Sequence, residues 1–161
     1  MSVLYYFIAW AVVLLFHVIV APRIAVLGIF PDVLTAVVVL IGLKRGWREG
    51  LWFGFAFGLS VDLMNPQKLG WMTLLLSWIG FLAGVVRETI LVENPWFEVI
   101  VVLLATFIYQ VLYRFLPAPQ FFADNLLKML LDSLLIAIYT VAAAALGLWI
   151  LRQNYRLREI L

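Results

Sequence analysis

The sequence predicts an all-α integral membrane protein, a single bundle of six transmembrane helices over residues 1–161. Hydrophobic residues make up 66% of the chain and charged residues only 12%, about half the charged fraction of a soluble domain. The mean hydropathy is +1.11. Because a spanning helix needs about 20 residues, six spans would use nearly the whole chain and leave no room for a soluble catalytic domain.

Six apolar runs supply the expected spans, at about 3–21, 29–43, 49–63, 69–86, 97–114 and 129–151. Pro22 and Arg23 end the first run, which lacks the basic start of a signal peptide and is therefore expected to be retained. Pro31 suits the first turn of the second helix. The third run ends before Asn65 and Pro66, a helix-breaking pair.

The later apolar runs also carry residues that indicate helix packing or helix boundaries. The fourth contains two glycines four residues apart, and the sixth contains AAAALG, which are small residues suited to close helix packing. Asn94 and Pro95 precede the fifth run as a helix start. The segment KRGWRE at 44–49 separates the second and third runs. Four charges at mid-membrane would cost several kcal/mol, so we expect a turn there rather than one merged span, which would leave five.

The basic residues predict the orientation of the bundle. With six spans, both termini lie on one side, which would carry Lys44, Arg45, Arg48, Arg87, Arg152, Arg156 and Arg158. The other side would carry Arg23, Lys68, Arg114 and Lys128. Cytoplasmic segments carry the excess of Lys and Arg, so both termini are predicted to be cytoplasmic.

A ridge of glycines is the most specific packing signal in the chain. Gly50, Gly54 and Gly58 recur every four residues and lead to Asp62, and in a helix each step rises about 6 Å along one face. Each interior glycine costs roughly 0.5–1 kcal/mol relative to alanine, a cost that a close helix contact can offset. Gly80 and Gly84 repeat the spacing. The ridge packs either within the bundle or against a span of a partner protein.

Ionisable residues gather where the six-span topology places the outer helix ends. They are Arg23, Asp32, Asp62, Lys68, Arg114, Asp124, Lys128 and Asp132. Asp32 stands at a helix start and is expected to cap it. Asp62 stands at a helix C-terminus, where the dipole disfavours an anion, so it needs a partner. Candidates are Lys68, Arg23, a basic residue of another subunit, or a bound partner or ligand.

The remaining polar residues predict structure rather than chemistry. Asp132 follows Lys128 by four residues, as in a helical ion pair, and His17 and Gln110 are expected to form hydrogen bonds between helices. With one histidine and no cysteine, we expect no metal and no cofactor. No nucleotide-binding motif, nucleic-acid-binding signature or nucleophilic serine motif is evident. An intramembrane aspartyl protease would need two carboxylates on facing helices, and no flanking motif supports one.

These motifs resemble those of the MreD family of bacterial rod shape-determining membrane proteins. The resemblance rests on Pro31 and Asp32 opening the second span, the run from Gly50 to Asp62, Leu69-Gly70, and the pair Gly80 and Gly84. It implies a fold similar to the substrate-binding subunits of energy-coupling-factor transporters. It also implies a non-catalytic scaffold in the inner membrane that binds MreC and associates with RodA and penicillin-binding protein 2, with MreB reached indirectly.

A solute-binding transporter subunit is the alternative from another class. Such a subunit would share the implied fold, and Arg23, Asp32, Asp62, Arg114 and Asp124 could line its ligand pocket near the outer face.

Overall fold

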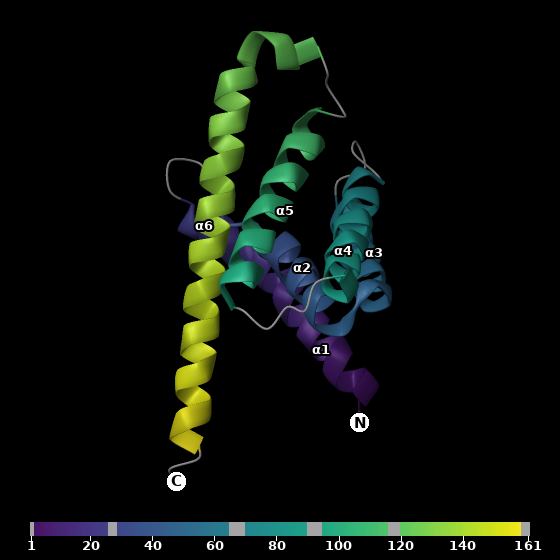
Figure 1. Ribbon diagram of the computed structural model, residues 1–161, viewed down its shortest axis with the longest axis vertical. Helices are drawn as coiled ribbons and strands as arrows, with labels where there is room; N and C mark the ends of the chain where they lie inside the picture. The colour runs from purple at the N-terminus through teal and green to yellow at the C-terminus, as the bar shows by residue number, and fades with distance from the viewer. Residues whose placement is uncertain (1, 26–28, 65–69, 90–94, 116–119, 159–161) are drawn as a thin grey trace.

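The computed structural model describes residues 2–25, 29–64, 70–89, 95–115 and 120–158. Six α-helices account for most of these residues (Figure 1). They are α1 (Ser2–Leu15), α2 (Val33–Arg45), α3 (Trp47–Asp62), α4 (Trp71–Thr89), α5 (Pro95–Phe115) and α6 (Gln120–Arg158). The all-helical class predicted from composition is therefore confirmed.

Helix α2 is the centre of the bundle. It packs against α3, α4, α5 and α6, while α3 and α4 form the most extensive helix pair and α5 packs along α6. Figure 1 shows α1 crossing diagonally past α2, and α6 running the full height of the molecule beside α5. Helix α1 begins and α6 ends at the same end of the bundle (Figure 1), the arrangement that an even number of crossings requires.

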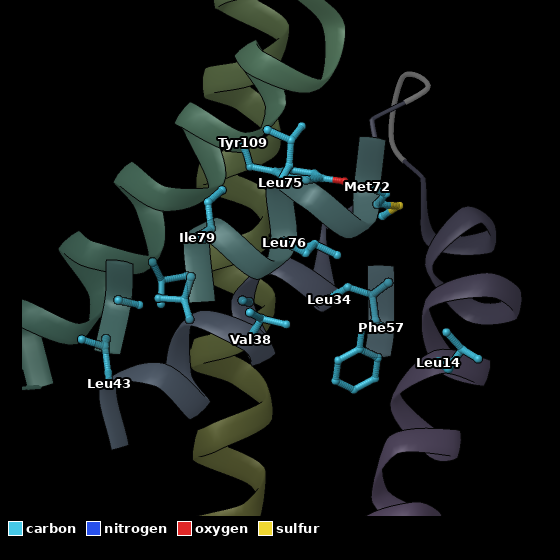
Figure 2. Close-up of a cluster of buried hydrophobic side chains, with 14 residues drawn as sticks. Leu14, Leu34, Val38, Leu43, Phe57, Met72, Leu75, Leu76, Ile79 and Tyr109 are labelled. Atoms are coloured by element: carbon cyan, nitrogen blue, oxygen red, sulfur yellow. The ribbon is translucent and has the colours of Figure 1, made fainter. Parts of the chain in front are cut away.

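The buried core is apolar, and much of the outer surface is apolar as well. Leu34, Val38 and Val39 of α2 are fully buried in one apolar cluster. Figure 2 shows Phe57 and Leu76 of this cluster beside Leu34 and Val38. Large hydrophobic side chains are also exposed on the outside of the helices, including Val12, Trp52, Trp78, Leu104 and Leu131. An apolar surface of this extent is typical of a protein solvated by lipid.

The first helix is irregular where the sequence predicted a continuous span to residue 21. The regular α-helix ends at Leu15, and a π-helical turn (η1, Phe16–Val20) and a 3-10 turn (η2, Ala21–Ile24) follow. Pro22 explains the change, because it has no N–H to donate and its ring collides with the carbonyl four residues earlier. The widened turn ends with the backbone N–H of Ala21 donating to the carbonyl of Phe16, five residues earlier.

The second helix begins later than expected. It starts at Val33 rather than near residue 29, so Pro31 precedes the N-cap residue Asp32 instead of occupying the first helical turn. At its other end, Gly46 alone separates α2 from α3. Gly46 has φ +107°, a backbone conformation that glycine adopts readily and other residues avoid. The charged segment 44–49 is thus a tight corner between two helices.

The last helix is longer than the predicted span of 129–151. Helix α6 extends from Gln120 to Arg158, with a kink at Asn125, whose φ of −133° and ψ of 25° are not helical. The apolar run expected from the sequence begins at about Met129, after the charged residues Asp124 and Lys128. A helix can continue through charged residues beyond the hydrocarbon region, where water solvates their side chains.

By length and apolar composition, three helical segments could cross a membrane in the part of the chain that the structure describes. They are Trp71–Thr89, Trp96–Phe115 and Asn125–Leu146, and Trp10–Ile24 is a shorter apolar helix. Helix α2 has 13 residues and α3 has 16. At 1.5 Å per residue they are about 20 and 24 Å long, less than the roughly 30 Å hydrocarbon core.

Candidate functional site

The glycine ridge of α3 packs against α4 inside the bundle. A methyl group added at Gly50 or Gly54 would fall closer than 3.0 Å to backbone atoms of α4, at Gly80 and Leu76 respectively, and one at Gly58 would meet Thr73. Side chains therefore cannot separate the two backbones along this line. Of the two possibilities that the sequence left open, the structure places the ridge in an internal contact.

Glycines on three helices meet at this contact, which we call the glycine seam. It consists of Gly42 of α2, Gly50, Gly54 and Gly58 of α3, and Gly80 and Gly84 of α4. A methyl group at Gly80 would meet the backbone of Gly50, and one at Gly84 would meet Trp47. The seam holds α2, α3 and α4 at backbone contact distance, as small-residue faces do between helices in membranes.

Asp62 caps the first turn of the neighbouring helix α4. Its carboxylate is buried, with 2% of the residue exposed. It accepts hydrogen bonds from the backbone N–H groups of Gly70 (3.0 Å), Met72 (3.3 Å) and Thr73 (2.8 Å), and from the Thr73 hydroxyl (2.6 Å). These N–H groups belong to a helix start, where no intrahelical acceptor exists for them.

The partner of Asp62 is a helix start rather than any of the cations expected from the sequence. Asp62 ends α3, whose C-terminal dipole repels an anion, but it also lies at the N-terminus of α4, whose dipole attracts one. Arg23 is exposed on η2, and Lys68 lies outside the described residues. A signal for the observed contact was present in Thr73, which stands at the third position of α4 and offers two donors.

Asp32 joins three helices at the start of α2. Its side chain accepts from the backbone N–H of Thr35 (3.1 Å), from the Thr35 hydroxyl (2.8 Å) and from Nε2 of Gln110 on α5 (3.0 Å). Its own backbone N–H donates to the Thr140 hydroxyl on α6 (2.8 Å), which in turn donates to the carbonyl of Ile136 (2.7 Å). Asp32 is 3% exposed. We call this set of contacts the Asp32 junction.

The ion pairs in the structure differ from the pair expected from the sequence. Asp132 pairs with Arg114 across α5 and α6 (3.6 Å) rather than with Lys128. At the opposite end of the bundle, Lys44 of α2 pairs with Glu98 of α5 (3.7 Å). The predicted ring of outer charges therefore does not converge on one pocket: Asp32 and Asp62 are turned inward onto helix N-termini, and Arg114 is turned toward α6. The side chain of Asp124 lies outside the described part of the structure.

Four buried polar side-chain atoms form no hydrogen bond with the residues that the structure describes. They are the hydroxyls of Thr106 and Tyr109 on α5, Nδ1 of His17 on η1 and Nε1 of Trp10 on α1. His17 was expected to form an interhelical hydrogen bond, but its ring instead packs edge-on against Phe30. Tyr109 is 1% exposed, and its hydroxyl points toward Met72 (Figure 2). Sequence spacing alone did not single out Thr106 or Tyr109.

Both carboxylates use their oxygens to satisfy helix starts, which is a structural task. Within the described ranges, no group of three or more His, Asp or Glu side chains is placed to hold a metal ion. The fold and its polar sites define a class: an all-helical, lipid-adapted bundle, closed by a glycine seam and by two buried carboxylate caps.

Comparison with known proteins places the chain within this class. The family described as rod shape-determining protein MreD matches residues 1–154, and the chain belongs to that family. Membership connects the chain to the determination of rod cell shape. No curated protein and no solved structure gives a significant match.

Proposed function

We propose that the protein is a non-catalytic scaffold of the bacterial cell-elongation machinery, which binds MreC and helps to organise peptidoglycan synthesis by RodA and penicillin-binding protein 2. The observation that carries the proposal is that the buried carboxylates are engaged in capping helices and not in chemistry. Asp32 and Asp62, the best candidates for chemistry, are occupied by hydrogen bonds from helix starts. What the chain offers to other molecules is the apolar outside of its helices.

The proposed setting is the inner membrane, with six spans and both termini in the cytoplasm. Membership in a membrane protein family and three helices of spanning length support this arrangement. Helices α2 and α3 are shorter than the hydrocarbon core, so the ends of the helices beside them lie close to the apolar region. The arrangement is compatible with this depth because the backbone N–H groups at the starts of α2 and α4 are capped by aspartate side chains and need no water.

Affinity capture of the tagged full-length chain from mildly solubilised bacterial membranes tests the proposal. We expect MreC, RodA and penicillin-binding protein 2 to be recovered together. Recovery of an ATPase module and a coupling subunit without MreC would overturn the scaffold and make the chain a transporter subunit.

Site-specific photo-crosslinking would then identify the face that MreC uses. A photoreactive residue can be placed at Trp78 on α4, Leu104 on α5 or Leu131 on α6, all exposed apolar positions. Val38 is the matched control because it is fully buried in α2. We expect an MreC adduct from at least one exposed position and none from Val38. Adducts from no exposed position, in membranes that contain MreC, would contradict direct binding through these faces.

A further inference from the structure

An apolar groove runs along the bundle between the irregular end of α1, the side of α2 and the side of α6. Its volume is about 270 Å³, and its walls include Phe16 and Ile24 of η1 and η2, Val37 and Leu40 of α2, and Ala143 and Ala144 of α6. The groove exists because the chain departs from a straight helix after Leu15 and because α6 presents alanines here.

The dimensions of the groove select a narrow occupant. The groove runs from Pro31, just before α2, to Leu40, and its helical part from Val33 onward is about 10 Å long. An α-helix with its side chains is about 10–12 Å across, whereas an extended hydrocarbon chain is a single CH₂ group wide. An extended hydrocarbon chain is narrow enough to fit.

A cation stands at one end of the groove. Arg23 directly precedes the wall residue Ile24, is exposed, and forms no ion pair with the residues that the structure describes. The Tyr139 hydroxyl donates to the carbonyl of Ile24 (2.7 Å) and so fixes this end of the groove against α6. The rest of the lining is almost wholly apolar. A charged end joined to an apolar channel matches an anionic head joined to a hydrocarbon tail.

We propose that this groove binds one acyl chain of an anionic phospholipid whose phosphate lies against Arg23. The proposal goes beyond the scaffold function and does not depend on it, because it concerns the lipid that the chain itself retains.

Native mass spectrometry of the purified full-length chain with added lipid tests the head-group contact. The probes are dioleoyl phosphatidylglycerol and dioleoyl phosphatidylcholine, which share their tails and differ in net charge. We expect phosphatidylglycerol to be retained about fivefold better, the ratio for one cation at a membrane surface. Arg23→Gln should abolish the preference and Arg23→Lys should keep it. Lys128→Gln is the matched control, since it removes an exposed cation elsewhere.

A second pair of variants tests the groove. Ala143→Leu adds volume to its wall and should reduce retention of both lipids, whereas Ala142→Leu, at an exposed neighbouring position, should not. Leu40→Phe serves the same purpose if Ala143→Leu does not fold. Equal retention of the two lipids by the wild type, or an unchanged preference in Arg23→Gln, would overturn the head-group contact. A photoreactive residue at Ala143 that captures a polypeptide in cell membranes, instead of lipid, would overturn the groove assignment.

Discussion

At the scale of single residues, the two buried aspartates perform the same task with the same partner type. Thr35 and Thr73 each donate a backbone N–H and a hydroxyl to an aspartate, and each stands at the third position of its helix. Asp32 caps its own helix, whereas Asp62 reaches across from α3 to α4. In a lipid environment an unsatisfied N–H costs several kcal/mol. The two carboxylates therefore make these helix starts tolerable at membrane depth.

Removing the Asp62 carboxylate should weaken the bundle in graded steps. Asp62→Ala leaves the first N–H groups of α4 without an acceptor and should destabilise the protein by about 2 kcal/mol or more. Asp62→Asn retains one acceptor oxygen and should cost less. The midpoint of thermal unfolding in mild detergent, followed by size-exclusion chromatography, measures both. Glu88→Gln, an exposed carboxylate near the end of α4, is the control. Equal stability of Asp62→Ala and the wild type would refute the cap.

The hydrogen bond from Gln110 to Asp32 predicts a difference between two substitutions. Gln110→Leu removes one donor to a buried carboxylate and should cost about 1.5–3 kcal/mol. Gln110→Glu places a second carboxylate against the first and should destabilise the bundle more, although glutamate is the closer match in shape. The same unfolding assay at neutral pH ranks the two variants. A Gln110→Glu protein more stable than Gln110→Leu would mean that the side chain does not face Asp32.

At the scale of helices, the sequence predicts local features well and their partners poorly. The glycine spacing and the position of Asp32 before a helix are local patterns, and both were recognised. The partner of Asp62 was missed because it depends on how α4 turns back after α3, and the Thr73 donors lie eleven residues away. The break in α1 was missed for another reason. Pro22 was interpreted as an end to the span, whereas its clash acts on the turn before it.

The glycine seam predicts that even one added methyl group is harmful. Gly54→Ala would place its Cβ against the backbone of Leu76, and overpacking of this kind typically costs 1–3 kcal/mol. Gly54→Leu should be worse and should reduce the folded yield. Ala142→Leu, an enlargement at an exposed position of α6, is the matched control. If Gly54→Ala unfolded at the wild-type temperature, α3 and α4 could not be in backbone contact there.

At the scale of the whole molecule, composition was sufficient for the class but not for the helix lengths. A chain with 66% hydrophobic residues must either bury its apolar surface or expose it to bilayer lipid. The all-helical membrane class followed directly from this requirement. The extent of α6 did not, because charged residues mark the edge of the hydrocarbon and not the end of a helix. The sequence predicted which residues belong to the candidate site but only some of their contacts. Gln110, Thr140 and Arg114 meet their partners through tertiary packing, which sequence spacing does not show.

The proposed orientation predicts which residues an impermeant thiol reagent can reach. The chain contains no cysteine, so single substitutions report without background. Met64→Cys, just after α3, should be labelled from outside spheroplasts, whereas Glu49→Cys, in the first turn of α3, should be labelled only after permeabilisation. Leu104→Cys, on the apolar outside of α5, should resist labelling in both conditions. Labelling of positions 49 and 64 from the same side would contradict a spanning α3.

The Asp32 junction also limits how early during synthesis the fold can be completed. The backbone N–H of Asp32 donates to Thr140, 108 residues later in the chain. At synthesis rates of about 5–20 residues per second, that acceptor is made roughly 5–20 s after Asp32. The α3–α4 pair closes between neighbours in sequence and needs no such delay. The nascent bundle therefore passes through a stage with a closed α3–α4 hairpin and an unfinished start of α2. A ribosome that stalls before α6 would leave that start exposed to the membrane's quality-control proteases.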